Sequence, residues 1–410
     1  MRVIVLLLLV LGFAGAITLE QALELAKERA NQIRLSELDI KKAEEEIKRA
    51  RAGILPQVSI SYNYSYFGQD LALGTTPNNR HSAVLQLNQT IFNKQVFELI
   101  KLANIQRELQ SLIKEDVQRT LESQVKDLFY GLLYRKALIE LQEENVNYWE
   151  ENYRVVSAKF SAGVVPKVEL LRAQSQLEQA RSQLEQARAD YLRALEDFKA
   201  LLKLEEDVEL EGTLELKEFN PKEEELLQAL KEKNSTLRVA KKLVELAQGT
   251  VELKRAQNFP TVNGFASYQL FTGKRSPVGD TELLKGYSFG VSINYLIFDG
   301  FSRKAEISVA EIDLLKQREN LLQLEYDLKA RLRSTLLSIN SLKAQIKALQ
   351  SALEFAKESL RLSTERYRLG VGSQLEVLEA RANYNNLLAN YYLLLYQYNS
   401  SLASLERLIQ

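Results

Sequence analysis

Long stretches in which apolar side chains recur every three or four residues dominate the chain. Between Asn93 and about Phe160 no proline interrupts this spacing. The apolar positions of this stripe are Leu109, Leu112, Ile113, Val117, Leu121, Val125, Leu128 and Leu132. At about 1.5 Å per residue, a helix of this length would extend on the order of 100 Å. The pattern predicts one very long amphipathic helix.

A strict seven-residue repeat follows a turn near residues 161–166. Large side chains occupy every seventh position, and alanines follow three residues behind them. These positions are Leu170, Leu177, Leu184, Tyr191 and Phe198, with Ala173, Ala180, Ala187 and Ala194. A seven-residue period favours a left-handed coiled coil, and alanine lets the helices approach closely. The segment is predicted to form an antiparallel coiled coil.

Four shorter segments alternate apolar and polar residues, which is the period of a β-strand. Apolar residues in the first and last segments are Val58, Ile60, Tyr62, Tyr64 and Tyr66, and Tyr287, Phe289, Val291, Ile293 and Tyr295. Their partners, 81–92 and 261–271, alternate less strictly, because Val84 and Phe265 fall among the polar positions. Strands of about ten residues, with aromatic residues concentrated toward their ends and small polar residues on the other face, fit a membrane β-barrel. A half-buried strand of a soluble sheet would show the same alternation.

An internal repeat organises these elements. Leu55-Pro56-Gln57-Val58 recurs as Phe259-Pro260-Thr261-Val262, and Ile91-Phe92-Asn93 recurs as Ile297-Phe298-Asp299. The glycine–glutamate pair at 163 and 169 recurs at 370 and 376, so the offset is about 204 to 207 throughout. Such self-similarity indicates two halves with one plan: helix, strand, loop, strand, very long helix, turn and long helix.

The repeat gives the expected boundaries. The first half is 17–204, with a β-hairpin at 57–92 and a helical tip near 161–166. The second is 221–410, with a β-hairpin at 261–298 and a tip near 368–373. The linker 205–220 is expected to contain a short strand at 208–214, and the loops 68–80 and 272–285 to face outside.

Each half is expected to begin with one helix that ends at a proline, Pro56 or Pro260, because proline lacks the N–H that would continue the ladder. Thr18 and Gln21 could form a capping box at the first start. Asn220-Pro221 with Glu223 is the stronger signal of the two, with proline at the first helical position.

Four strands cannot close a barrel, since the smallest membrane barrels have about eight. An open sheet in lipid would leave the backbone groups of its edges unsatisfied. The chain is therefore expected to form a homotrimer that shares a twelve-stranded barrel with a water-filled lumen. The predicted fold class is mainly α with membrane β, with long antiparallel coiled-coil helices and two tandem structural repeats.

Residues 1–16 resemble a removed signal peptide. Arg2 precedes an apolar run from Val3 to Phe13, and Ala14-Gly15-Ala16 forms a cleavage site. The run is too short to span a bilayer, which needs about 20 apolar residues. The chain has no cysteine, which excludes disulfides and thiolate metal sites. Lys and Arg balance Asp and Glu at 54 each, so the chain has no excess of positive charge that would favour binding of nucleic acid.

The sequence contains no signature of an enzyme. His81, the single histidine, is expected to be an ordinary surface residue, and Trp149 to serve packing. No Walker loop, dinucleotide-binding glycine pattern or nucleophile elbow occurs. We expect no catalytic residue, metal site or cofactor.

At this point the residues resemble the TolC-like outer-membrane efflux proteins over nearly all of 17–410. The resemblance rests on the duplicated Leu/Phe-Pro-x-Val starts, Ile-Phe-Asp-Gly at 297–300, and the Gly…Glu segments 163–169 and 370–376. It implies a trimeric channel-tunnel, in which the long helices form a periplasmic α-barrel, that serves a tripartite efflux or type I secretion system. Its implied partners are a periplasmic adaptor, an inner-membrane pump and outer-membrane lipid.

The resemblance also implies site residues. The entrance would carry Glu376 and Glu379, with Glu169 as the corresponding acid of the first half and Tyr367 as a gate tyrosine. The family's gate arginine has no counterpart, because Gly372 occupies its position. The adaptor-docking tips would be Gly163, Val164 and Val165 in one half and Leu369, Gly370 and Val371 in the other.

The alternative is a periplasmic coiled-coil spacer or adaptor without a membrane pore. An adaptor is expected to have one helical hairpin and a separate barrel domain instead of two equal halves. A spacer would dissolve in buffer, whereas a channel would need detergent.

Overall fold

The computed structural model describes residues 16–206 and 208–410, so the expected signal peptide lies outside the described residues except for Ala16. The described chain forms two compact units. The first comprises the described residues up to 35 together with 114–236 and 325–410, and the second comprises 36–113 and 237–324. Each unit therefore draws on both halves of the sequence.

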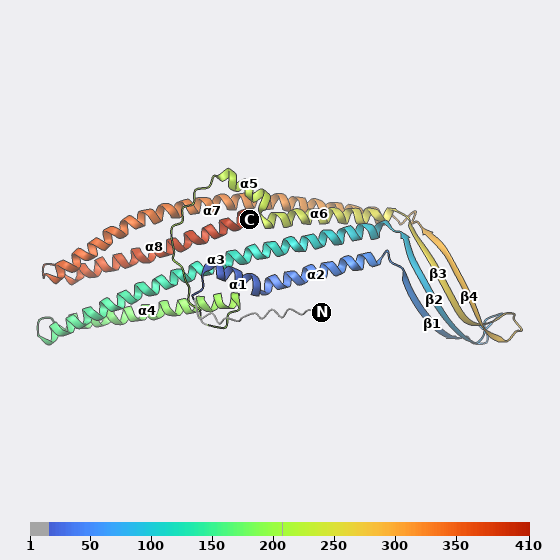
Figure 1. Cartoon of the computed structure of the whole chain (residues 1–410), viewed down its shortest axis with the longest axis horizontal. Coiled ribbons are helices and arrows are strands. Elements are labelled where there is room, and N and C mark those ends of the chain that lie inside the picture. Colours follow the sequence, from blue (N-terminus) through green and yellow to red (C-terminus); the bar gives the residue numbers. More distant parts are fainter. Residues whose placement is uncertain (1–15, 207) are drawn as a thin grey trace, which may run out of the picture. The chain divides into compact units, whose positions relative to one another are not determined.

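The second unit contains one antiparallel sheet in the order β1-β2-β3-β4 (Figure 1). The strands are β1 (Gln57–Tyr66), β2 (Asn79–Phe92), β3 (Thr261–Lys274) and β4 (Thr281–Asn294). The predicted loop 272–285 is shorter than expected, because β3 and β4 continue pairing as far as Lys274 and Thr281. The backbone hydrogen bonds between β3 and β4 therefore extend into the segment that was predicted to be a loop.

The register places the predicted apolar positions on one face. Val58 pairs with Leu87, Leu87 with Ala266, and Ala266 with Phe289. The next row consists of Ile60, Leu85, Tyr268 and Tyr287. Because alternate side chains point to opposite faces, these rows form one continuous apolar surface across all four strands.

The opposite face is mostly polar, and its apolar residues include Phe271 paired with Leu284 as well as the two that the sequence predicted. Val84 pairs with Ser61 and Gln269, and Phe265 pairs with Asn88 and Gly290. A Cβ at position 290 would lie 2.9 Å from the Phe265 ring, so glycine makes room for that ring. The hydroxyl oxygens of Ser267 and Ser288 lie 2.8 Å apart on this face.

The first unit contains the greater part of two long helical hairpins, whose first helices begin in the second unit (Figure 1). They are formed by α3 (Lys94–Ser161) with α4 (Lys167–Leu202), and by α7 (Ser302–Arg368) with α8 (Gln374–Ile409). Large side chains fill the core near the base of the first hairpin, where the Phe129 and Phe198 ring centroids lie 6.2 Å apart. Further along, Trp149 packs with Leu177, Ala180 and others, which confirms its predicted packing role.

The expected single helix at the start of each half is wrong. The first half has α1 (Leu19–Arg29) and α2 (Asn31–Ala52), and the second has α5 (Glu223–Lys233), α6 (Ser235–Arg255) and the short η1 (Ala256–Asn258). Ala30 and Asn234 leave helical geometry with ψ of 127° and 119°. The Asn234 amide donates to the Leu408 carbonyl at 3.0 Å, so a tertiary contact stabilises the second break.

The two predicted helix starts have different outcomes. The Thr18–Gln21 capping box is confirmed, with bonds of 3.0 and 3.4 Å. The stronger signal is wrong, because Lys222 caps α5 without a side-chain bond. The Asn220 amide oxygen accepts from Lys343 at 2.9 Å and Glu223 accepts from Arg333 at 2.8 Å. Contacts with α7 therefore occupy both side chains that would have formed the cap.

The short strand expected at 208–214 is also wrong. Leu210 forms only an isolated parallel bridge with Ile17, and the segment joins no sheet. The alternating Val208 and Leu210 are buried in the helical core of the first unit. A period of two therefore marks an extended segment that packs against helices. Among residues 16–206 and 208–410, no helix has the length and apolar character needed to cross a membrane.

Candidate functional site at the helical turns

The first helical turn joins α3 to α4 through residues 162–166. Gly163 has φ +73°, a left-handed conformation that costs glycine nothing. Its N–H donates to the Phe160 carbonyl at 2.9 Å, and the Val164 N–H donates to the Lys159 carbonyl at 2.8 Å. These two bonds satisfy the last carbonyls of α3 and reverse the chain.

The second turn repeats this geometry between α7 and α8. Gly370 has φ +77°, and its N–H donates to the Tyr367 carbonyl at 3.1 Å. The Val371 N–H donates to the Arg366 carbonyl at 3.0 Å. Both predicted tip glycines thus serve the local reversal, which accounts for their identity without any partner.

The reversal does not account for the exposed apolar side chains around it. Val164, Leu369 and Val371 are 69%, 71% and 68% exposed, while Val165 is half-buried. Sequence reasoning missed three neighbours that extend these patches: Val168, Leu171 and Leu375, all exposed. The spacing of Val164, Val168 and Leu171 by four and three residues was the signal that could have identified them.

The acidic residues near the turns differ in their surroundings. Glu376 closes a cap at the start of α8: its N–H donates to the Ser373 hydroxyl at 3.2 Å. Its carboxylate also lies 3.6 Å from the Arg366 guanidinium. Glu169 pairs with Arg172 of the same helix at 3.2 Å. Glu379 is exposed and lies beside a cavity.

Tyr367 lies under a cation from the other hairpin. The Lys159 ammonium is 5.4 Å from the Tyr367 ring centroid, within the range of a cation–π contact. Glu376 lies instead beside Arg366, six residues before Gly372, the position that lacks the expected gate arginine. The structure therefore brings Tyr367 and Glu376 to different cations.

A partly buried arginine that the sequence did not identify lies further along α8. The Arg381 guanidinium is 3.4 Å from the ring centroid of Tyr148 on α3. Burial lowers the pKa of Arg381 and raises the pKa of Tyr148. The Arg381 Nε is buried and has no hydrogen-bond partner among the described residues. A lone arginine in a helix carries no signal of this role in the sequence.

Polar side chains join α3 to α8 on both sides of Arg381. The Gln374 amide donates to Asn152 and the Asn385 amide donates to Asn145, each at 3.1 Å. A cavity of about 440 Å³ lies beside Arg381 and the Asn145–Asn385 pair. This polar seam contrasts with the apolar packing of Trp149 inside the first hairpin. The two hairpins are therefore joined near their tips by hydrogen bonds and a cation–π contact.

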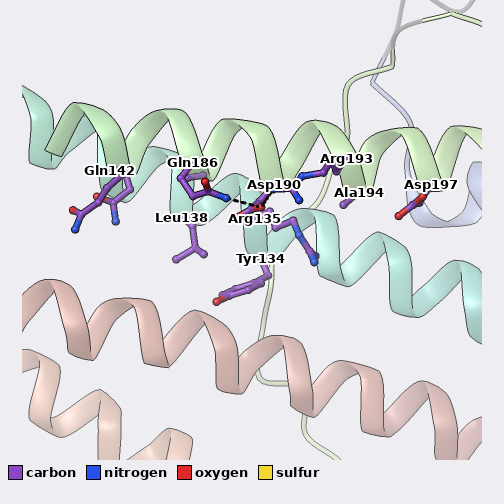
Figure 2. A pocket seen from close by; sticks show the side chains of 11 residues that line it. Tyr134, Arg135, Leu138, Gln142, Gln186, Asp190, Arg193, Ala194 and Asp197 are labelled. Atoms are coloured by element: carbon purple, nitrogen blue, oxygen red, sulfur yellow. Dashed lines mark hydrogen bonds and ion pairs between the residues drawn. The ribbon is translucent and has the colours of Figure 1, made fainter. Parts of the chain in front are cut away.

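A second, larger groove of about 790 Å³ runs between α3 and α4 (Figure 2). The Asp190 carboxylate in its wall accepts from Gln186 at 3.1 Å and from Arg193 at 2.5 Å. Tyr134 stacks on Tyr396 with ring centroids 5.8 Å apart. Within the described ranges, no group of three or more histidine, aspartate or glutamate residues could hold a metal ion. Within this groove Asp190 and Arg193 are therefore already paired with each other.

The sequence model of the family described as outer membrane efflux protein matches residues 22–202 and 226–409. The chain belongs to this family. It is 23% identical over 400 residues to the outer membrane protein TolC of Escherichia coli K12, covering 93% of this chain and 80% of TolC. It is also 22% identical over 280 residues to the probable efflux pump outer membrane protein TtgC of Pseudomonas putida, covering 66% and 56%.

Solved structures of similar fold agree with this assignment. The CmeC outer membrane channel of Campylobacter jejuni superposes with a TM-score of 0.81 at 18% identity, covering 95% of this chain and 85% of CmeC. The open MtrE channel of Neisseria gonorrhoeae gives 0.78 at 19% identity, covering 95% and 88%. The predicted fold class, long helices with one four-stranded antiparallel sheet in two similar halves, is confirmed.

The chain is an outer-membrane efflux channel that extends into the periplasm, as the sequence predicted. No observation favours the alternative of a spacer or adaptor without a pore. The family is a family of transport channels and not of enzymes.

Proposed function

We propose that three copies of this chain form one continuous export duct, with a shared twelve-stranded barrel above a helical tunnel. The observation that supports this assembly is the open sheet. β1 and β4 are its edges, and one face is apolar across all four strands. Lipid offers no partner for the backbone groups of a free edge, so β1 of one copy must pair with β4 of the next.

We infer that the repeats 17–204 and 221–410, joined by 205–220, give each copy two equivalent β-hairpins and two equivalent helical tips. Three copies then provide twelve strands and six tips. Twelve lies between the filled eight-stranded barrels and the open porins of about sixteen strands, so the lumen should hold water.

The first test concerns assembly. Detergent-purified protein is expected to be a trimer by light scattering, because the monomer cannot close its sheet. The absence of native cysteine permits a direct check. Cysteines at Ser61 of β1 and, in separate variants, at Ser288 or Ser292 of β4 should give disulfide-linked species up to trimers. A monodisperse monomer with native β content would contradict the assembly.

We further propose that the duct serves a tripartite efflux or type I secretion system and that its tips dock a periplasmic adaptor joined to an inner-membrane pump. Exposed apolar side chains at both turns support this proposal, since Val164, Leu369 and Val371 are about 70% exposed and are not covered by any of the described residues. Small exposed apolar side chains at a turn can pack against a helical hairpin of a partner protein. The name of the TtgC relative refers to an efflux pump.

We propose that Glu376 and Glu379 form an acidic ring at the periplasmic entrance, with Glu169 and Tyr367 nearby. Three copies would place six carboxylates around a narrow opening, where low-dielectric walls strengthen their field. Arg366 partly neutralises Glu376 at 3.6 Å, so Glu379 should contribute more to that field.

The channel is therefore expected to prefer cations and to be blocked by trivalent cations. In planar bilayers, Glu379→Gln should weaken the block more than Glu376→Gln, and the double variant should abolish it. Glu358→Gln, at an exposed position of α7, is the matched control and should leave the blocking constant unchanged. An unchanged constant in the double variant would show that both acids are solvated surface residues.

A further inference from the structure

The apolar face of the sheet carries basic residues at one end only. Lys285, His81 and Lys274 all occupy this face, at the end where the loops 67–78 and 275–280 connect the strands. The rows nearer the helices, such as Val262 with Ile293, contain none. The three basic side chains therefore lie at one border of the apolar band.

Each of the three rows at this border also contains a tyrosine of β1. Tyr62 belongs to the row of Ala83, Leu270 and Lys285, and Tyr64 pairs with His81. In the outermost row, Tyr66 pairs with Asn79, and Lys274 pairs with Thr281. Tyrosine is enriched where a membrane protein crosses from hydrocarbon to headgroups, so these rows have the composition of an interface.

No acid on this face balances the three basic residues. Glu282 is the single acidic residue within the four strands, and it lies on the opposite face. It pairs there with Arg275 at 2.9 Å. Asp70 and Asp280 belong to the connecting loops, beyond the paired rows. The border therefore presents uncompensated positive charge toward whatever surrounds the sheet.

His81 is held in a defined orientation. Its Nδ1 lies 2.8 Å from the Tyr62 hydroxyl, and its ring centroid lies 5.0 Å from that of Tyr64. Its backbone N–H donates to the Thr272 hydroxyl at 2.8 Å. When the tyrosine hydroxyl donates to Nδ1, the proton of the ring resides on Nε2, which is then available as a hydrogen-bond donor.

We propose that Lys274, Lys285 and His81 form a binding site for the phosphate-bearing headgroup of an outer-leaflet lipid. This inference rests on the proposed barrel, which turns the apolar face toward lipid and the loops toward the outside. Phosphate oxygens accept several hydrogen bonds at once, and ammonium, imidazole and phenol groups supply complementary donors. Positive side chains near a membrane surface attract anionic lipid, and near the interface their exposure to lipid costs little.

The test uses the detergent-purified channel and lipid A with two phosphates, compared with dephosphorylated lipid A and a zwitterionic phospholipid. Native mass spectrometry reports bound lipid and trimer mass together. Wild-type protein is expected to retain the phosphorylated lipid preferentially. Each neutralisation to glutamine should weaken binding about fivefold, and the triple variant about 100-fold.

Arg80→Gln is the matched control. It removes a positive charge from the residue next to His81 on the opposite face, where Arg80 lies 5.6 Å from the Phe271 ring, and should leave lipid binding unchanged. Lys285→Gln alone serves as the test if the triple variant does not fold.

Three results would overturn the site: equal binding of phosphorylated and dephosphorylated lipid, unchanged binding by the Lys285→Gln and triple variants, or displacement of the lipid by excess inorganic phosphate. The last result would identify free phosphate as the occupant. A wild-type protein that is not trimeric would contradict the proposed assembly and the lipid site with it. Selective retention that is lost in the variants, with trimer mass and conductance unchanged, would establish the site.

Discussion

Replacing both Val164 and Val371 with aspartate is expected to abolish export while the trimer and its sheet remain intact. Both side chains are about two-thirds exposed, and neither forms the turn bonds, which involve the backbone. The folded chain should therefore tolerate the change. At an adaptor interface, each aspartate would instead bury an unpaired charge, and a trimer would contain six of them.

The measurements are adaptor crosslinking, export by cells that carry the variant, and trimer mass. Ser351→Asp introduces the same charge at an exposed position of α7 away from the turn and should retain export. Val164→Thr with Val371→Thr keeps side-chain shape and should reduce export only partly. Normal export by the double aspartate variant would show that these turns only reverse the chain and that the adaptor docks elsewhere.

Arginine on the apolar face of the sheet is expected to destabilise the membrane-inserted protein strongly. Ile60 and Val291 are 77% and 62% exposed on this face of the single chain, so in the barrel they would contact lipid. Arginine at either position should cost roughly 2–4 kcal/mol if the site lies near the bilayer midplane. Arginine at Asn63, which pairs with Ser82 on the polar face, should cost far less.

Folding titrations in lipid vesicles, followed by the β-sheet circular dichroism signal, measure these differences. Asn63→Arg is the matched control, because it adds the same side chain on the same strand as Ile60→Arg. Equal destabilisation at Ile60 and Asn63 would mean that the apolar face does not contact lipid and that the sheet belongs to a soluble assembly.

The sequence by itself determined the features that have local causes. The alternation along each strand defined both faces of the sheet, including the misplaced Val84 and Phe265, because side chains point to opposite faces at a fixed period of two. The positions of the helical turns also followed locally, since Gly163 and Gly370 adopt left-handed backbone conformations that glycine accepts without strain.

Candidate site residues were harder to predict, because exposure and partners depend on neighbours distant in sequence. The sequence selected Glu376 as an entrance acid, but only the structure shows its N–H bonded to the capping Ser373 hydroxyl and its carboxylate beside Arg366. Nothing in the sequence singled out Arg381, whose position over Tyr148 requires α3 and α8 to pack together.

Only the tertiary structure determined the conformation of segments in which long-range contacts outweighed the local sequence signal. Alternation at 208–214 indicated a strand, but burying Val208 and Leu210 against helices left no neighbouring strand to complete a ladder. Asn220 and Glu223 could have capped α5, but each bonds instead to a basic residue of α7. A local hydrogen bond contributes about 1 kcal/mol, so a competing tertiary contact of similar strength is enough to redirect the side chain.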